Sequence, residues 1–308
     1  MMITMPARVA AAAAAVSQKP DAGGASVPRR IAFTTPLTYA ARIARTIELR
    51  GWEPYHCPTI SVGPTPRTHS ALEPYLLPPD PILRLFSAVA FTSRNGIAAF
   101  ADSLRPGFPP LPPSSGEVFT VSALGNDAEL LDDAFLFGLC PDPSRLEVLV
   151  PPVATPAGLV QYLGPGSGRK ILCPVPLVVA LEEPPVVPDF LDGLMRNGWD
   201  PVRVPAYETS WAGPESAEAL LEVAEILDAV VFTSSAEVEG LLKGLKELGF
   251  CEWEKLRQRW PELVVAAHGP VTAAGAARLG VVVDVVSRRF GSFEGVMEVL
   301  ERTWGKSE

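Results

Sequence analysis

Hydroxyl side chains follow two apolar runs of this sequence, each directly ahead of a stretch with helical periodicity. Thr92 and Ser93 follow the first run, and Thr233 and Ser234 follow the second. A hydroxyl in such a turn can cap the helix, because its oxygen accepts a hydrogen bond from a free N–H group. The same N–H groups and hydroxyls can instead bind a carboxylate or a phosphate. Both interpretations stay open for each copy.

Other side chains and glycines fall in turns of the same kind. Arg94 and Asn95 continue the first hydroxyl turn. Arg94 is either an ordinary surface residue or the guanidinium fork that carboxylates favour. Gly125 and Gly269 each follow an expected strand, where they serve a tight turn or allow a ligand to approach the backbone. Tyr207 either packs at a strand end or uses its phenol to donate a proton or a hydrogen bond.

Several other kinds of site are disfavoured. The sequence contains neither G-x-G-x-x-G nor a Walker A motif, and the Gly-rich run at 164–168 precedes an expected strand, whereas a phosphate-binding loop follows one. The four cysteines form no C-x-x-C pair, and with only three histidines no structural zinc site is expected. We expect Cys57, Cys140, Cys173 and Cys251 to be free thiols in a reducing compartment.

The composition limits the class of partner. A formal net charge of −9 argues against nucleic acid, because phosphate contacts need clustered Lys and Arg, but it leaves a small anionic ligand possible. The 308 residues, 47% of them hydrophobic, suffice for two domains with substantial cores. No uninterrupted apolar run of about 18 residues occurs, so no membrane span is expected.

Residues 1–29 differ from the rest of the chain. They are rich in Ala, carry Arg8 and Arg29 with Arg30 directly after them, and contain one acid, Asp21. This composition fits an organellar transit peptide and equally a disordered Ala-rich tail. The first interpretation predicts a chloroplast location, and the second leaves the cytoplasm as the alternative.

An internal repeat indicates the elements that position the polar turns. Three short motifs recur in the same order and at nearly constant spacing, which suggests a duplicated architecture. They are Gly-Trp at 51–52 and 198–199, Phe-Thr-Ser at 91–93 and 232–234, and Ala-x-Gly at 123–125 and 267–269.

Short β-rich runs alternate with helical segments, which is typical of βαβ units and parallel sheets. The expected strands are 31–35, 53–60, 88–92, 117–123, 147–150, 170–174, 200–207, 229–233, 263–267 and 281–286. The expected helices are 37–50, 95–104, 126–138, 156–163, 187–197, 215–227, 235–249, 270–279 and 292–303. The Pro-rich segments 74–81 and 106–116 are expected to be surface loops. Ligands of such sheets bind at the carboxyl ends of the strands, where the polar turns fall, together with a turn at Cys173.

The ordered set of motifs resembles the uroporphyrinogen-III synthase family. Residues 90–96 (AFTSRNG) are similar to its Phe-Thr-Ser-Pro-Asn-Gly motif, 206–209 (AYET) to its Tyr-x-Thr segment, and 230–234 (VVFTS) to its second Phe-Thr-Ser. Residues 267–274 (AHGPVTAA) are similar to Ile-Gly-Pro-x-Thr-Ala, and 293–295 (FEG) also fit. The resemblance spans about 31–303.

The resemblance implies an α/β fold of two flavodoxin-like domains, each a doubly wound parallel sheet, joined by two extended strands. Domain one would hold 31–57 plus 208–308 and domain two 61–204, with connecting strands near 57–62 and 202–208. The implied reaction closes hydroxymethylbilane into uroporphyrinogen III with inversion of ring D. The chain would need no metal or organic cofactor, bind neither nucleic acid nor membrane, and be a monomer.

The resemblance also implies roles for individual residues. Tyr207 would assist departure of the substrate's hydroxyl, and Thr233 and Thr272 would bind substrate. The full set of expected substrate contacts is Thr34, Thr35, Thr92, Ser93, Arg94, Asn95, Gly125, Asn126, Thr155, Thr233, Ser234, His268, Gly269 and Thr272.

Three departures from the family pattern keep alternatives open. The segment 173–176 stands where many members have Arg-Gly, 125–128 lacks a hydroxyl, and His268 replaces an aliphatic residue. A noncatalytic member that binds a tetrapyrrole or another anion is the first alternative. A two-lobed small-molecule sensor of similar architecture is the second.

Overall fold

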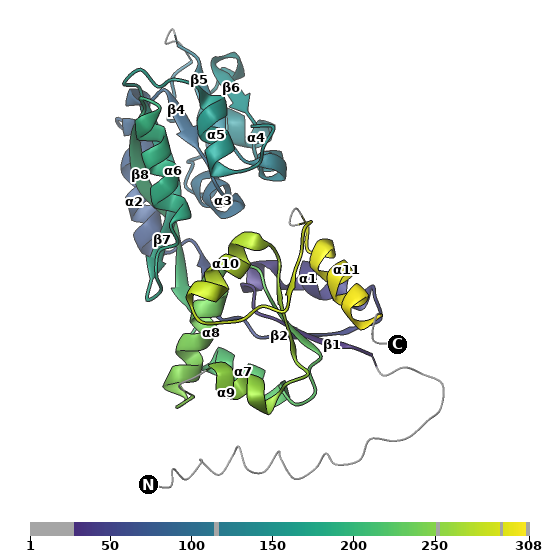
Figure 1. The fold of residues 1–308 in the computed structure, drawn as a ribbon. Coiled ribbons are helices and arrows are strands. Elements are labelled where there is room, and N and C mark those ends of the chain that lie inside the picture. The colour runs from purple at the N-terminus through teal and green to yellow at the C-terminus, as the bar shows by residue number, and fades with distance from the viewer. Residues whose placement is uncertain (1–27, 114–116, 251–252, 290–291, 306–308) are drawn as a thin grey trace. The chain divides into compact units, whose positions relative to one another are not determined.

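The computed structural model describes residues 28–113, 117–250, 253–289 and 292–305. The chain forms two compact units. Unit 1 combines the segment up to Thr59 with the segment from Ala212 onward, and unit 2 spans Ile60–Trp211 (Figure 1). The expected transit peptide or tail at 1–29 lies outside the described residues except for its last two, and the chloroplast location that depends on it stays a prediction.

Unit 1 is built on a five-stranded parallel sheet in the order β11-β10-β9-β1-β2. The strands are β1 (Arg30–Phe33), β2 (Glu53–His56), β9 (Ala229–Phe232), β10 (Val264–Ala267) and β11 (Val285–Val286). The helices are α1 (Leu37–Glu48), α7 (Glu215–Val223), α8 (Ser235–Glu247), α9 (Trp253–Arg259), α10 (Pro270–Arg278) and α11 (Glu294–Trp304).

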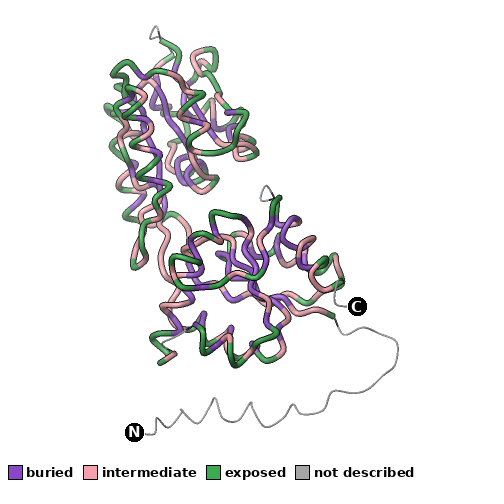
Figure 2. Tube along the Cα trace, viewed as in Figure 1, coloured by how far each residue is buried: buried purple, intermediate pink, exposed green. Residues whose placement is uncertain are grey.

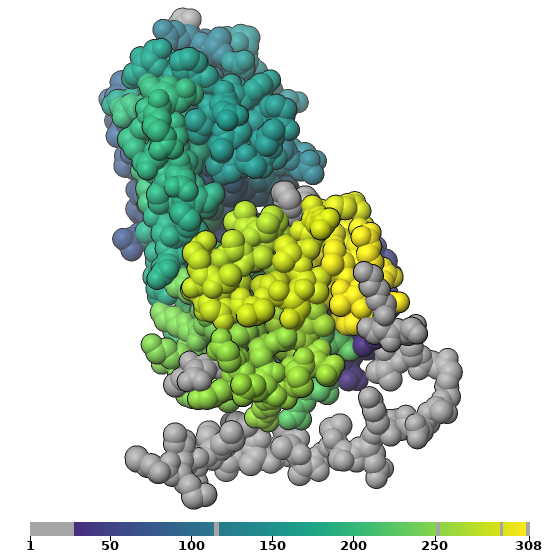
Figure 3. Space-filling model, viewed as in Figure 1, coloured from purple at the N-terminus to yellow at the C-terminus, as the bar shows by residue number. Residues whose placement is uncertain are grey.

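Helices cover both faces of this sheet. Along β9, Ala229 and Val231 pack with α1 and α11, whereas Val230 and Phe232 pack with α7, α8, α9 and α10. A strand that is covered on both sides consists of continuous apolar residues, and β9 is fully buried. In Figure 2 the buried stretches of the chain, in purple, run through the interior of unit 1. In Figure 3 the C-terminal part of the chain, in yellow, forms much of the surface of unit 1 on the face in view.

Unit 2 carries a six-stranded sheet in the order β3-β8-β7-β4-β5-β6, in which only the β3–β8 pair is antiparallel. The strands are β3 (Ile60–Gly63), β4 (Ala88–Ala90), β5 (Phe119–Ser122), β6 (Leu146–Leu149), β7 (Lys170–Val179) and β8 (Asp200–Trp211). The α-helices are α2 (Pro66–Leu76), α3 (Arg94–Asp102), α4 (Asp133–Leu139), α5 (Pro156–Leu163) and α6 (Val186–Arg196). Short 3-10 helices are η2 (Ile82–Leu85), η3 (Gly125–Leu130) and η4 (Pro143–Arg145).

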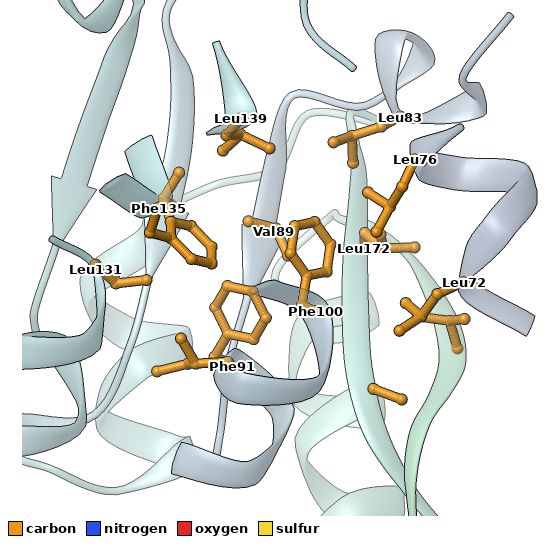
Figure 4. Close-up of a cluster of buried hydrophobic side chains, with 14 of the residues drawn as sticks. Leu72, Leu76, Leu83, Val89, Phe91, Phe100, Leu131, Phe135, Leu139 and Leu172 are labelled. Atoms are coloured by element: carbon orange, nitrogen blue, oxygen red, sulfur yellow. The ribbon is translucent and has the colours of Figure 1, made fainter. Parts of the chain in front are cut away.

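The larger core of unit 2 lies between its sheet and α2, α3 and α4. Phe91, Phe100 and Phe135 form its aromatic centre, with ring centroids 5.3–6.0 Å apart (Figure 4). The opposite face is covered by α5 and α6 through Leu159, Phe190 and neighbouring aliphatic residues. Each unit thus has its own pair of cores, one on either face of its sheet.

The two sheets repeat one arrangement of strands. The order β2-β1-β9-β10-β11 in unit 1 matches β8-β7-β4-β5-β6 in unit 2, so the recurring motifs occupy equivalent strands. Gly51 and Gly198 both have positive φ, 71° and 80°, in the turns that lead into β2 and β8. In unit 1 this is the strand order of a flavodoxin-like sheet, 2-1-3-4-5. In unit 2 the strands have the same spatial order, but those at the third, fourth and fifth positions (β4, β5 and β6) precede those at the first and second (β7 and β8) in the sequence.

Several element predictions differ from the structure around prolines. Pro74, expected in a loop, lies inside α2, a helix that was not predicted and that begins with a capping box at Thr65. The expected turn at Cys173 is absent, because β7 continues to Val179 through Pro174. Strand β4 pairs with β7 only as far as Leu172, so a proline beyond that point interrupts no ladder on that side.

Other boundaries also shifted. The helix expected at 126–138 is divided into η3 and α4, because Asp132 caps a new helix by accepting a hydrogen bond from the N–H of Phe135 at 2.9 Å. Helix α9 was not predicted. Strand β8 runs to Trp211 and pairs antiparallel with β3, so Tyr207 and its neighbours, expected at the domain boundary, lie within the sheet of unit 2.

Replacing Gly166 with Ala is expected to destabilise unit 2. The glycine is buried, and an added Cβ would lie 2.4 Å from the backbone nitrogen of Trp199. Such overpacking costs about 1–3 kcal/mol. Urea denaturation measures the loss, and Gly63→Ala is the control, because a Cβ there meets nothing within 4 Å. Equal stability of the two variants would contradict the prediction.

Candidate functional site

In unit 2, the expected catalytic residue and an expected binding residue meet at the end of β4. Ser93 caps α3, its Oγ accepting a hydrogen bond from the N–H of Gly96 at 3.2 Å. The same Oγ lies 2.9 Å from the hydroxyl oxygen of Tyr207, which comes from β8 and is only 6% exposed. The sheet therefore brings together two hydroxyls that are far apart in the sequence.

The register of two strands places Tyr207 in this position. Strand β7 pairs with β8 along its whole length, with a shift between Val175 and Pro176, so that Pro176 lies beside Tyr207. On the other side, the first turn of α3 packs closely on β7, since a Cβ added to Gly96 would lie 3.1 Å from the carbonyl oxygen of Pro174. The long β7 thus supports both members of the hydroxyl pair.

The remaining predicted residues of unit 2 form two sets. Thr92 and Asn95 are half-buried beside Ser93, and Arg94 is exposed in the first turn of α3. Gly125, with φ +49°, comes close to the loop before α5, since an added Cβ would lie 3.0 Å from the Cβ of Ala154. In that loop Thr155 caps α5 by accepting from the N–H of Gly158 at 3.0 Å, and Asn126 is exposed after Gly125.

In unit 1, several predicted hydroxyls converge on a carboxylate that the sequence reasoning missed. The Oγ1 of Thr34, after β1, donates to Glu237 Oε2 at 2.7 Å. After β9, the N–H of Thr233 donates to the same oxygen at 2.9 Å, and its Oγ1 donates to Oε1. Ser234 Oγ donates to Oε1 at 3.2 Å and accepts from the N–H of Glu237 at 3.3 Å. Glu237 is 1% exposed, so the hydrogen-bond partners of its carboxylate are groups of the protein.

A sequence signal for Glu237 was present. Ser234 is followed three residues later by Glu237, which is the capping-box spacing at the start of a helix. In the usual box the glutamate reaches back to the backbone N–H of the cap residue. Here it accepts a hydrogen bond from the N–H of Thr233, one residue earlier, and another from the hydroxyl of Thr34, which follows a second strand.

Two other predicted threonines of unit 1 are buried. Thr272, 6% exposed, donates its hydroxyl to the carbonyl oxygen of Thr233 at 2.9 Å and so supports the β9 turn. Thr35 is 1% exposed, and among the described residues its hydroxyl has no hydrogen-bond partner. Its carbonyl oxygen accepts from the Nε2 of His56 at 2.8 Å. Neither threonine side chain is displayed at the surface.

His268 and Gly269 lie at the end of β10. Burial lowers the pKa of His268, and the positive charge of Arg42 adds to that effect, while a backbone hydrogen bond to Ser292 acts against it. The imidazole stacks on Phe293 with centroids 6.4 Å apart. Gly269 is the N-cap residue of α10 and contributes no side-chain cap.

The described residues offer no ready ligand set for a metal ion: in these ranges no three His, Cys, Asp or Glu side chains cluster. Cys57, Cys140 and Cys173 are buried free thiols, and burial raises the pKa of Cys57 to about 11. Cys251 lies outside the described residues. Within the same part of the chain, every helix is too short or too polar to cross a membrane.

Comparison with protein families gives a match over most of the chain. The family model described as uroporphyrinogen-III synthase HemD matches residues 41–295. The chain belongs to the uroporphyrinogen-III synthase family. Its members are lyase-type cyclases of tetrapyrrole biosynthesis. The resemblance inferred from the motifs is thereby confirmed.

Solved structures confirm the fold of this uroporphyrinogen-III synthase family member. A mutant uroporphyrinogen III synthase from the extremely thermophilic bacterium Thermus thermophilus is 20% identical, with a TM-score of 0.51 over 90% of this chain and 99% of that one. The uroporphyrinogen-III synthetase of Helicobacter pylori is 16% identical, with a TM-score of 0.50 over 89% and 99%. No curated protein sequence matches this chain. The structural matches confirm the predicted two-domain α/β fold.

Proposed function

We propose that this protein converts hydroxymethylbilane into uroporphyrinogen III. The terminal hydroxyl leaves with a proton as water, which gives an electrophilic azafulvene. The substituted carbon of ring D bonds to the methylene of the azafulvene and forms a spiro intermediate. The bond between ring D and its original methylene then breaks. The free carbon of ring D bonds to that methylene instead. The proton that this carbon releases replaces the one lost from the pyrrole nitrogen, so the net change is loss of one water.

The hydrogen-bonded pair of Tyr207 and Ser93 is the observation that carries the proposal. Ser93 Oγ already accepts from the N–H of Gly96, which favours donation of its own hydrogen to the oxygen of Tyr207. Tyr207 in turn can donate to the departing hydroxyl of the substrate, because a phenol is a good proton donor to a developing hydroxide. The pair lies at the carboxyl edge of the sheet, where ligands of such folds bind.

Helix N-termini at the carboxyl edge of each sheet match the carboxylates of the substrate. The first turns of α3 and α10 present N–H groups and the positive end of a helix dipole. Arg94 is exposed in the first turn of α3. These local groups can bind an anion despite the net charge of −9.

We propose that the reaction needs no cofactor. The pyrrole nitrogen pushes out the hydroxyl, so the step requires neither a redox change nor an external electrophile. The contribution of the protein is to hold one substrate geometry, which favours closure with inversion over closure without it. The rate should therefore survive treatment of the protein with a chelator.

Product analysis tests the proposed function. Purified protein is incubated with freshly made hydroxymethylbilane, and the products are oxidised and separated as porphyrin isomers. An excess of type III over the spontaneous type I isomer would support the proposal. Type I alone, from protein shown to be folded, would contradict it.

One observation favours a second candidate, a noncatalytic member that binds a tetrapyrrole or another anion. Because β7 continues past Cys173 to Val179, unit 2 offers no loop with free N–H groups at this position of its sheet. The segment at 125–128 is a 3-10 turn with one acidic residue, Asp127, and no hydroxyl. Binding of a tetrapyrrole without formation of the type III isomer would distinguish this candidate.

A further inference from the structure

The two copies of the Phe-Thr-Ser motif differ at one position of the following helix. Residue 96 of the first copy and residue 237 of the second both stand three positions after the capping serine. The first is Gly96 and the second is Glu237. The strands before these two residues are equivalent in the two sheets, so the two residues can be compared directly.

In unit 2 this position has little room for a side chain. A Cβ added to Gly96 would lie 3.1 Å from the carbonyl oxygen of Pro174. The capping Ser93 is therefore left to pair with the hydroxyl of Tyr207. Two hydroxyls that can each donate or accept a hydrogen bond meet at this end of β4.

In unit 1 the same position carries a buried carboxylate that fixes the direction of the neighbouring hydroxyls. When ionised, this carboxylate only accepts hydrogen bonds, so Thr34, Thr233 and Ser234 each direct their hydrogen to it. Thr34 is fully buried, but Thr233 and Ser234 are half-buried and reach the surface. Among the described residues, Thr233 Oγ1 accepts no hydrogen bond. The oxygen of this hydroxyl is therefore available as an acceptor.

The helix that carries Glu237 is itself held in place. Thr59 donates its hydroxyl to the carbonyl oxygen of Glu237 at 2.8 Å, and Thr272 donates to the carbonyl oxygen of Thr233 at 2.9 Å. These bonds come from two different segments of the chain. The turn cannot easily rotate to present a hydroxyl hydrogen instead.

We propose that Glu237 is a positioning residue that makes the end of β9 a site for a hydrogen-bond donor of the ligand, a pyrrole N–H group. The assignment rests on the proposed function for the nature of that donor. The carboxylates of the ligand are bound elsewhere, at backbone N–H groups. The duplicated motif has thus diverged, with an acceptor in unit 1 and a hydroxyl pair in unit 2.

The protonation of Glu237 provides a pH signature. Burial raises its pKa above the ordinary value, while the hydrogen bonds from Thr233, Thr34 and Ser234 oppose the rise, and no charged side chain contributes. When the carboxyl is protonated it becomes a donor, and one of the hydroxyls must turn its hydrogen outward. Selectivity for a donor should therefore be present above the pKa of Glu237 and be lost as the pH falls through it.

The test compares a monopyrrole bearing carboxylate side chains with its N-methyl counterpart, which lacks the donor. Binding to the full chain is measured by NMR titration. Wild-type protein should favour the N–H compound about tenfold, the value of one hydrogen bond of about 1.4 kcal/mol. Glu237→Gln places an amide donor among the hydroxyls, so the preference should fall to about twofold or less. Glu247→Gln, at the exposed far end of α8, is the matched control and should keep it.

Three outcomes decide the proposal. A folded Glu237→Gln protein that keeps the tenfold preference, or a wild-type protein without any preference, would overturn it. If Glu237→Gln does not fold, Thr233→Val removes the acceptor oxygen while Glu237 stays, and the preference must disappear there too. The isomer assay on the same preparations separates the two claims, because donor selectivity without type III product would refute only the proposed function.

Discussion

Replacing Tyr207 with Phe should lower the rate of type III formation about 10²-fold or more, the usual contribution of a positioned proton donor. The ring stays in the core of unit 2, where Tyr207 is 6% exposed, so the fold should persist. Only the oxygen 2.9 Å from Ser93 is lost. The rate is measured under single-turnover conditions, with KM determined separately, because the loss should fall on kcat.

The controls isolate the hydroxyl itself. Tyr162→Phe removes a hydroxyl from an exposed tyrosine of α5 in the same unit and should leave the rate unchanged. Ser93→Ala removes the partner of Tyr207 together with the cap of α3 and should reduce the rate less than Tyr207→Phe does. A Tyr207→Phe rate within a few-fold of wild type would remove the phenol from the mechanism.

Replacing Phe100 with Ala should cause the largest loss of stability among single truncations in unit 2. Phe100 lies on α3, is fully buried, and contacts Phe91 and Phe135 with centroids 5.3 and 5.9 Å apart. Truncation of such a ring costs about 3–5 kcal/mol, since the cavity cannot fully collapse. Urea denaturation should show an earlier transition for unit 2. Because α3 begins directly after Ser93, activity should fall as the helix loosens.

A matched truncation tests whether burial is the cause. Phe137→Ala on α4 removes the same ring from a side chain that is 56% exposed. Its effect on the free energy of unfolding should be within about 0.5 kcal/mol, as for other surface substitutions. Similar losses in the two variants would contradict the assignment of Phe100 to the core.

Much of the architecture could be predicted from local patterns. Apolar runs such as 229–232 identified buried parallel strands, because a strand covered on both faces has no polar alternation. The repeated motifs identified equivalent strands of two sheets. Elements whose start depends on a cap were harder to predict. The helix at Pro66–Leu76 was missed because Pro74 suggested a loop, and the capping box at Thr65 was overlooked.

The placement of the polar turns at strand ends could be predicted from the sequence, but their hydrogen bonding could not. Thr233 and Ser234 were placed correctly at a strand end, yet their shared partner Glu237 was found only in three dimensions. The hydroxyl of Thr272 donates to the carbonyl oxygen of Thr233, a contact that the sequence did not indicate. The pairing of Tyr207 with Ser93 depends on the register of β7 against β8, including a shift between Val175 and Pro176. Sequence spacing does not specify such a register.

The isomer ratio as a function of enzyme concentration tests the central claim most directly. Hydroxymethylbilane closes spontaneously to the type I isomer, so enzyme and solution compete for the same substrate. We predict that the fraction of type III product rises with the concentration of folded protein. It should approach one when closure on the enzyme is much faster than the spontaneous reaction. A fraction that stays at the spontaneous level at every protein concentration would contradict the account.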